Sequence, residues 1–278
     1  MNNEKGSLYI VSTPIGNLDD ITIRAIEVLK SVDTCASEDT RVSRILFKHY
    51  GIETKLTSYH KFSEKSKTNS LIKTLESSKD VALISDAGTP LISDPGQYLV
   101  EKAIERGISV IPIPGATSII SALTVSGFDL RNFSFYGFFP RKSKERQKLL
   151  KMIASSASPS VLFESGKRLE SLFNTISDFL PGSLRVFVAR EMTKLHETFY
   201  RGTIKDIKEI VLGSKFGQKG EFVVVIEGSD SQSYETSFDE KHLLEILMKK
   251  VDRKLALELA SEILGKKRNE LYKIKLKN

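Results

Sequence analysis

The feature that most constrains the fold is a regular alternation of short apolar runs with amphipathic segments over the first 128 residues. The apolar runs predict strands at 8–12, 34–38, 55–59, 81–85 and 109–113. The segments between and after them predict helices near 20–31, 40–49, 66–78, 96–106 and 116–126. Such alternation is typical of an α/β domain with a parallel sheet covered by helices. Ligands bind beyond the carboxyl ends of such strands, so the loops after them are the candidate site.

A second unit begins near residue 132, where apolar residues alternate more strictly with polar ones. Strands are predicted at 133–139, 160–164, 185–190, 196–202 and 221–227, and helices at 143–156, 166–179 and 204–213. This pattern favours a mixed or antiparallel sheet. The expected organisation is an N-terminal α/β domain (1–130), a second α/β domain with a mixed sheet (131–228) and a small helical tail (239–278).

The polar segment 228–237 between the second domain and the tail reads as a linker. In the tail, Leu255, Leu259 and Ile263 recur at helical spacing, and Gly265 interrupts the pattern. Two short helices around a glycine turn, the second of them basic, resemble a helix-turn-helix. A helical cap that packs on the second domain explains the same pattern.

The positive charge is concentrated in two segments. Residues 141–151 and 266–278 each carry six bases and one acid, a local charge of +5, whereas the whole chain has a formal charge of +7. A basic run is often only a solvated helix face. Two such runs in one chain favour a partner that carries phosphates.

Several classes of protein are disfavoured. There is no apolar run of 18 residues and no signal-peptide pattern, which predicts a soluble protein that is not exported. A single Cys35 fits a reducing cytoplasm, and four scattered histidines suggest no metal site. Neither G-x-G-x-x-G nor a P-loop follows the first strand, which argues against NAD dehydrogenases and NTPases.

Four loops follow predicted strands of the first domain: "TPIGNLDD", "EDTR", "DAGTPLISDPG" and "PGATS". Gly88 lets a backbone approach a ligand closely, and Pro90 fixes the turn. Thr117 and Ser118 stand at a predicted helix start, where their hydroxyls can bind a polar group or simply cap the helix. Asp94 is expected at the start of the next helix. Each loop alone fits a structural role, but four loops at the carboxyl ends of the strands of one sheet predict a pocket.

A series of motifs resembles the tetrapyrrole methylase superfamily. In chain order they are "LYIVSTPIGNLDDIT", "ASEDTR", "LISDAGTPLISDPG", "IPIPGATSIISAL", "FYGFFPRKS", "FESGKRL", "AREMTKLHET" and "KGEFVVVI". The resemblance covers roughly residues 7 to 228, and the tail resembles the small tail domain of one branch. It implies a two-domain fold that binds S-adenosylmethionine between the domains.

Two departures indicate the branch. The first loop has Thr13-Pro14-Ile15-Gly16-Asn17 where porphyrinoid enzymes have G-x-G-x-G-D, and Ser85-Asp86-Ala87-Gly88-Thr89-Pro90 replaces their G-D-P. Both agree with the branch that methylates the 2′-oxygen of a cytidine in the decoding region of 16S rRNA, in the small ribosomal subunit. The alternatives are a porphyrinoid C-methyltransferase of the same fold, and a nucleic-acid-binding regulator whose sheet domain senses a nucleotide.

The resemblance also implies site residues. Those expected to bind the cofactor are Pro14, Asp86, Gly88, Thr89, Pro90, Thr117, Ser118, Glu164, Ala189 and Glu221. Candidates for the base that takes the 2′-hydroxyl proton are Glu38, Asp39 and Asp86. The residues expected to contact RNA are Arg41, Arg141, Lys142, Lys144, Arg146, Lys167, Lys266, Lys267 and Arg268. The aromatic residues of 133–139 either stack on a base or, more simply, pack in the core. A homodimer is expected because family members often dimerise.

Overall fold

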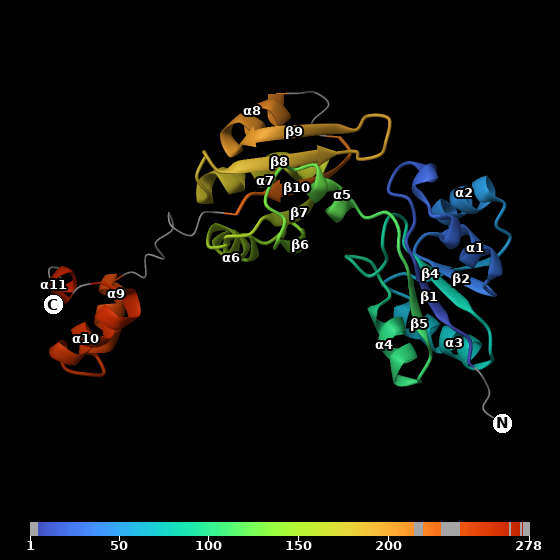
Figure 1. Ribbon diagram of the computed structural model, residues 1–278, viewed down its shortest axis with the longest axis horizontal. Helices are drawn as coiled ribbons and strands as arrows, with labels where there is room; N and C mark the ends of the chain where they lie inside the picture. Colours follow the sequence, from blue (N-terminus) through green and yellow to red (C-terminus); the bar gives the residue numbers. More distant parts are fainter. Residues whose placement is uncertain (1–4, 214–218, 229–239, 267, 273, 275–278) are drawn as a thin grey trace. The chain divides into compact units, whose positions relative to one another are not determined.

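The computed structural model describes residues 5–213, 219–228, 240–266, 268–272 and 274 (Figure 1). The chain forms two compact units. The first comprises Met1–Ala154 and Ser158–Gly228, and the second comprises Ser155–Ala157 and Ser229–Asn278. The predicted linker 228–237 lies outside the described residues except for Gly228.

The first sheet has five parallel strands in the order β3-β2-β4-β1-β5. The strands are β1 (Leu8–Val11), β2 (Thr34–Ser37), β3 (Lys55–Ser58), β4 (Val81–Ile84) and β5 (Val110–Ile113). A short 3-10 helix, Leu18–Asp20, precedes the first α-helix. The helices of this part are α1 (Ile23–Ser31), α2 (Thr40–Tyr50), α3 (Glu64–Glu76), α4 (Gln97–Glu105) and α5 (Ser118–Thr124). The predicted parallel α/β domain is confirmed.

Alternation along the strands divides the core between the two faces of this sheet, because successive side chains point to opposite sides. Val81 and Leu83 pack with residues of α3 and α4 on one face. Ala82 and Ile84 pack with residues of α1 and α2 on the other. The strand is therefore apolar at every position, as expected for a strand buried on both faces.

The connections place a ligand site between β1 and β4. The two strands are neighbours, but β1 continues into α1 on one face and β4 continues into α4 on the other. Such a divergence is a topological switch point, where a crevice opens at the carboxyl ends of the strands. The loops after β1 and β4 are consequently the first place to look for function.

The second sheet is mixed, as the alternating pattern predicted. Its order is β6-β7-β10-β8-β9, with β6 and β7 parallel and the other pairs antiparallel. Its strands are β6 (Ser134–Phe138), β7 (Ser160–Ser165), β8 (Arg185–Arg190), β9 (Thr198–Thr203) and β10 (Glu221–Ile226). The helices α6 (Ser143–Ala154), α7 (Gly166–Phe179) and α8 (Ile204–Gly213) contribute to a core on one face, and residues of α5 contribute to the core on the other.

The second unit contains α9 (Glu240–Met248), α10 (Arg253–Leu264) and α11 (Arg268–Leu271). Leu244, Leu257, Ala260 and Leu271 form its small core. Helix α10 ends at Gly265, which has a φ of +63°, as the predicted glycine turn requires. Among the described residues, no helix is both long and apolar enough to span a bilayer.

Candidate active site

The loops that follow β1 and β4 meet at a short antiparallel bridge between Thr13 and Gly88. The Thr13 N–H donates to the Gly88 carbonyl at 2.9 Å, and the Gly88 N–H donates back at 3.0 Å. Gly88 has a φ of +80°, and a Cβ there would lie 3.3 Å from Cγ2 of Ile15. A left-handed conformation favours glycine, so this residue lets the two loops approach.

The loop after β5 joins them through side-chain hydroxyls. The hydroxyl oxygens of Ser12 and Thr89 are 2.9 Å apart, and the Thr89 hydroxyl also donates to the Ala116 carbonyl at 3.2 Å. A Cβ on Gly115 would lie 2.9 Å from the Cβ of Ser12, so glycine is needed for this approach. Three strand-end loops thus form one connected wall.

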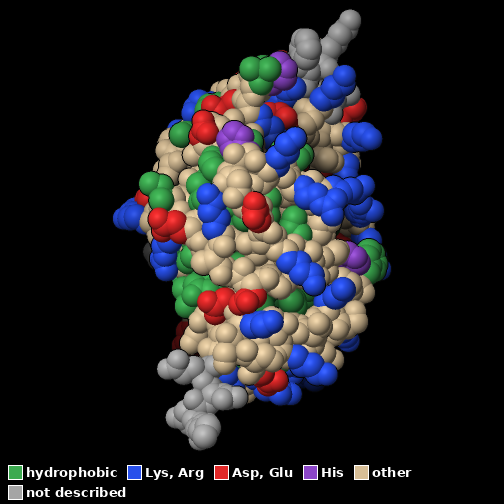
Figure 2. Space-filling model, turned by 90° about the vertical axis from the view of Figure 1, so that its right-hand side faces the viewer, with side chains coloured by type: hydrophobic (Ala, Val, Ile, Leu, Met, Phe, Trp, Pro, Cys, Tyr) green, Lys and Arg blue, Asp and Glu red, His purple; other side chains and the backbone are tan. Residues whose placement is uncertain are grey.

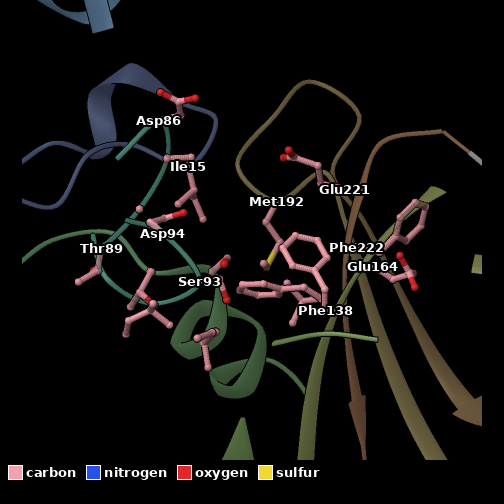
Figure 3. A pocket seen from close by; sticks show the side chains of 18 of the residues that line it. Ile15, Asp86, Thr89, Ser93, Asp94, Phe138, Glu164, Met192, Glu221 and Phe222 are labelled. Carbon is pink, nitrogen blue, oxygen red and sulfur yellow. The ribbon is translucent and has the colours of Figure 1, made fainter. Parts of the chain in front are cut away.

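This wall and part of the second sheet enclose a cavity of about 340 Å³, called the main cavity here (Figure 3). Its volume is within the range of small-molecule sites. The first wall contributes Ile15, Asp86, Ala87, Gly88, Thr89, Ile92, Ser93, Asp94, Thr117, Ser118 and Ile119. The opposite wall contributes Phe138, Phe163, Glu164, Ser165, Glu191, Met192, Lys194, Glu221, Phe222 and Val223.

Backbone strain is concentrated in the loops around the main cavity. Among the described residues, five residues other than glycine have a positive φ, and four of them are Leu91, Ser93, Glu191 and Thr193. The first two belong to the loop after β4, and the other two follow β8. Such conformations cost roughly 1–3 kcal/mol each and cluster at functional sites.

Part of the opposite wall is apolar. The rings of Phe138 and Phe163 meet edge to face with centroids 5.6 Å apart, and Met192 lies beside Phe138 in Figure 3. Phe138 is 56% exposed, whereas the next residue, Phe139, is buried in the core. The predicted aromatic run therefore splits, since Phe139 packs in the core and Phe138 faces the cavity.

The main cavity is strongly acidic. Its lining includes one lysine, Lys194, and five carboxylates: Asp86, Asp94, Glu164, Glu191 and Glu221. Lys194 donates to Glu191 at 3.0 Å and to Glu221 at 2.8 Å. The cavity consequently keeps an excess of negative charge, which favours a cationic ligand.

Burial and mutual repulsion raise the pKa values of several of these carboxyls. Desolvation is the main cause for Asp86, Asp94 and Glu164. Glu164 is 2% exposed, and its Oε2 has no hydrogen-bond donor among the described residues, only an ion pair with Arg168 at 3.3 Å. In Glu191, desolvation is outweighed by the Glu221 N–H and the Lys194 ammonium, which lower its pKa.

A second depression of about 460 Å³, called the side cavity here, opens at the ends of β2, β3 and β4. Its lining is polar and consists of Glu38, Asp39, Thr40, Arg41, Ser58, His60 and Asp86. Asp86 lines both cavities. A ligand in the side cavity can therefore approach a ligand in the main cavity at this carboxylate.

Asp39 and Asp86 differ in how their carboxylates are used. Asp39 caps α2 by accepting from the Arg41 N–H at 2.8 Å, and it pairs with the Arg41 guanidinium at 2.6 Å. These hydrogen bonds from Arg41 lower the pKa of Asp39 to about 2. Asp86 accepts from the Asp39 N–H at 2.9 Å, but desolvation still raises its pKa.

Of the residues expected to bind a cofactor, seven line the main cavity: Asp86, Gly88, Thr89, Thr117, Ser118, Glu164 and Glu221. Pro14 and Pro90 belong to the same loops but do not line it, and Ala189 is buried within β8. Thr117 stands at the N-cap of α5 without a capping hydrogen bond from its side chain. The three candidate bases all line the side cavity.

The residues expected to bind RNA are more dispersed. Arg141, Lys142 and Lys144 are exposed at the start of α6, and Lys167 is exposed at the start of α7. Arg146 instead donates to the Pro140 carbonyl at 2.8 Å and to the Ser171 hydroxyl at 3.0 Å.

In the second unit Arg268 pairs with Glu258, Lys266 follows α10, and Lys267 lies outside the described residues. On the face shown in Figure 2, basic side chains are interspersed with acidic ones.

Several lining residues were not anticipated from the sequence. Asp94 was expected only at a helix start, yet Gly96 is the N-cap of α4 and the Asp94 side chain lines the main cavity. The motif that contains Glu191, Met192 and Lys194 belongs to the resemblance, but Ala189 was its only position expected to bind the cofactor. His60 follows β3, whose terminal loop was not included among the candidate loops.

A sequence model of the tetrapyrrole (corrin/porphyrin) methylases matches residues 7–208. Full-length relatives are named ribosomal RNA small subunit methyltransferase I. The protein from Escherichia coli O157:H7 is 41% identical over 99% of this chain and 96% of its own length. The relative from Haemophilus influenzae is 42% identical over 99% and 98%, and that from Synechocystis is 41% identical over 98% of both.

Solved structures share the fold at low sequence identity. A diphthine synthase superposes with a TM-score of 0.63 at 15% identity, over 80% of this chain and 90% of its own. Uroporphyrin-III-C-methyltransferase from Thermus thermophilus superposes with a TM-score of 0.57 at 18% identity, over 80% and 94%. These likenesses establish the fold and leave the substrate to the residues of the site.

Proposed function

The chain belongs to the tetrapyrrole methylase family, within its group of ribosomal RNA small subunit methyltransferases I, and on this premise we propose its reaction. It transfers a methyl group from S-adenosylmethionine to the ribose 2′-oxygen of a cytidine in the decoding region of 16S rRNA. The observation that carries this proposal is the identity of about 40% to the rRNA enzymes over nearly the whole chain, tail included.

The main cavity fits S-adenosylmethionine in its chemistry. The cofactor supplies a methyl group on a positively charged sulfur. Five carboxylates against one lysine suit that charge. The Glu164 Oε2 has an ion pair with Arg168 but no hydrogen-bond donor among the described residues, so it can accept from a hydroxyl. The remaining residues proposed to hold the cofactor are Gly88, Thr89, Thr117, Ser118 and Glu221, which line the cavity, Pro14 and Pro90, which belong to its loops, and Ala189, which is buried in β8.

Asp86 is the best candidate for the base among Glu38, Asp39 and Asp86. It lines both cavities, and its raised pKa makes it a stronger proton acceptor than an ordinary aspartate. Asp39 is a weaker base because the hydrogen bonds from Arg41 lower its pKa to about 2. Asp86 is therefore proposed to take the proton of the 2′-hydroxyl, while the walls of the main cavity align the reacting groups and exclude water.

Exposed cations are proposed to bind the phosphates of the RNA. Arg41 is 84% exposed at the rim of the side cavity, and Lys167, Arg141, Lys142 and Lys144 are exposed at the starts of α7 and α6. The two basic segments of the sequence, 141–151 and 266–278, also include Arg146, Lys266, Lys267 and Arg268. Phosphate contacts of this kind supply affinity, and contacts to a base supply specificity.

Two further expectations belong to this proposal. The protein is proposed to act in the cytoplasm, where small ribosomal subunits are found, and to form a homodimer. Light scattering tests the second point, since a monomeric mass at micromolar concentration would contradict it. The three-part organisation with boundaries near residues 130 and 239 likewise remains a prediction, which limited proteolysis can test.

The deciding experiment measures methyl transfer from labelled S-adenosylmethionine to small ribosomal subunits isolated from cells that lack this gene. We expect a single 2′-O-methylcytidine in the decoding region, restored by the wild-type protein and not by Asp86→Asn. Uroporphyrinogen serves as the competing substrate. Transfer to uroporphyrinogen alone would establish the porphyrinoid alternative, and binding of RNA without any transfer would favour a regulator.

A further inference from the structure

The side cavity contains two polar groups without a hydrogen-bond partner among the described residues. The Glu38 carboxylate is half-buried and accepts no hydrogen bond. The buried Nδ1 of His60 also has no partner. The Nδ1 of His60 is fully buried, whereas the Glu38 carboxylate remains open to solvent in the depression. A solvent-accessible carboxylate that accepts from no described residue is free to accept a hydrogen bond from a ligand.

The other carboxylates of the side cavity already accept hydrogen bonds from the protein. Both oxygens of Asp39 accept from the Arg41 side chain, and Oδ1 of Asp86 accepts from the Asp39 N–H. Among the described residues, none donates to Glu38, so both of its oxygens can accept from a ligand, whereas Asp86 has only Oδ2 left for the 2′-hydroxyl. The ligand group that it recognises must be a donor, because an ionised carboxylate can only accept.

The electrostatic surroundings of Glu38 strengthen this requirement. Burial and the negative charges of Asp94, Asp86 and Asp39 raise its pKa. A hydrogen-bond donor placed against the carboxylate offsets that repulsion, whereas a carbonyl oxygen increases it. The charge around Glu38 therefore favours a ligand that places an amine, rather than a carbonyl, against this carboxylate.

We propose that the side cavity receives the base of the target nucleotide, and that Glu38 determines specificity by accepting a hydrogen bond from its exocyclic amine. The inference rests on the proposed function and deepens it. Cytosine presents an amine at the position where uracil presents a carbonyl, and carboxylates are known acceptors for that amine. A base in the side cavity brings its ribose to Asp86, which lines both cavities.

An aromatic platform stands next to the side cavity. Phe62 is 97% exposed, and its ring centroid lies 6.2 Å from that of His60. Proteins that read single-stranded RNA stack splayed bases on such side chains. A base placed between Phe62 and Glu38 stacks on the Phe62 ring and donates a hydrogen bond to the Glu38 carboxylate.

The test compares two matched substrates, small subunits with cytidine or with uridine at the target position. Wild-type protein is expected to prefer cytidine by about 10-fold or more in kcat/KM, as expected for one base-specific hydrogen bond. In Glu38→Gln the amide can also donate to the uracil carbonyl, so the preference is expected to fall towards 1. Glu53→Gln is the control, because Glu53 is exposed outside both cavities and should keep the wild-type preference.

A different role for Glu38 gives a different result. If Glu38 were the base for the 2′-hydroxyl, Glu38→Gln would slow transfer to both substrates equally, and an unchanged preference would overturn the proposal. Binding of cytidine and uridine 5′-monophosphates to the cofactor-free protein provides a readout without transfer. Tighter binding of the cytidine nucleotide that is lost in Glu38→Gln supports the side cavity even if RNA methylation fails, and equal binding of the two nucleotides by wild-type protein overturns it.

Discussion

At the scale of single residues, the carboxylates that follow the strands have different roles. Asp39 caps a helix and forms an ion pair, and Asp86 lines both cavities. Glu38 accepts no hydrogen bond from any residue that the structure describes. The neighbouring donors determine these roles, because a carboxylate can cap a helix, act as a base or bind a ligand according to which donors surround it.

Gly88→Ala is expected to weaken cofactor binding by 10-fold or more. A Cβ at a φ of +80° is strained and would press on Ile15 in the wall of the main cavity. Calorimetric titration with S-adenosylmethionine measures the effect. Gly107→Ala is the matched control, because Gly107 has a φ of +61° with no atom near its Cβ position. Both variants should lose about 1 kcal/mol of stability, so similar affinities in the two would contradict the prediction.

Glu38→Gln is expected to stabilise the protein at neutral pH by up to about 1 kcal/mol. The pKa of Glu38 is raised in the folded state, so its contribution to stability is fully present below the unfolded-state value near 4.5 and is lost as the pH rises through the folded-state value. The amide removes that loss. Thermal unfolding at pH 7.5 and at pH 4 measures it, and a gain of Tm that persists unchanged at pH 4 would refute this cause.

How far single residues could be predicted depends on where their information lies. Thr117 and Ser118 could be proposed because a strand end followed by a helix start is visible in the sequence. Lys194 is different, because its role depends on Glu221, which is 27 residues away in the sequence. Convergence of that kind is set by the pairing of β10 with β8, and no local pattern contains it.

At the scale of elements, hydrophobic periodicity predicted the strands and helices to within a few residues. It did so because β4 and the central strands β8 and β10 of the second sheet are buried on both faces and therefore form short continuous apolar runs. The 3-10 helix at Leu18–Asp20 was not predicted, because three residues with one apolar side chain are too few for a periodic pattern. The order of strands in the second sheet could not be predicted, because a mixed sheet allows many pairings of similar strands.

Asp252→Ala is expected to destabilise the start of α10 by about 1 kcal/mol. The Asp252 carboxylate accepts from the Lys254 N–H at 2.9 Å and from the Leu255 N–H at 3.0 Å. Amide hydrogen exchange in the first turn of α10 should become faster, with exchange in β1 and β4 unchanged. Glu262→Ala, an exposed position in the last turn of the same helix, is the control, and equal acceleration by both variants would exclude a capping effect.

At the scale of the whole molecule, two acidic cavities occur in a chain of formal charge +7. The excess of positive charge therefore lies elsewhere, including the helical second unit. Residues 249–254, which comprise the connection after α9 and the first two residues of α10, carry four bases and one acid. Lys249, Lys250 and Lys254 are exposed and have no carboxylate within ion-pair distance among the described residues. Exposed positive charge without a paired carboxylate can bind the phosphates of an RNA.

The double variant Lys249→Glu, Lys250→Glu is expected to reduce affinity for small subunits by 10-fold or more while S-adenosylmethionine binding stays unchanged. If both lysines contact phosphates, the slope of log affinity against log salt should fall by about 0.7 to 0.9 per contact. The control is the double variant Lys30→Glu, Lys48→Glu. It makes the same change of charge in the last turns of α1 and α2, near the amino ends of the parallel strands and away from the cavities. Equal losses in the two variants would mean that net charge alone attracts the subunit, and a steeper loss in the first would assign RNA binding to the tail.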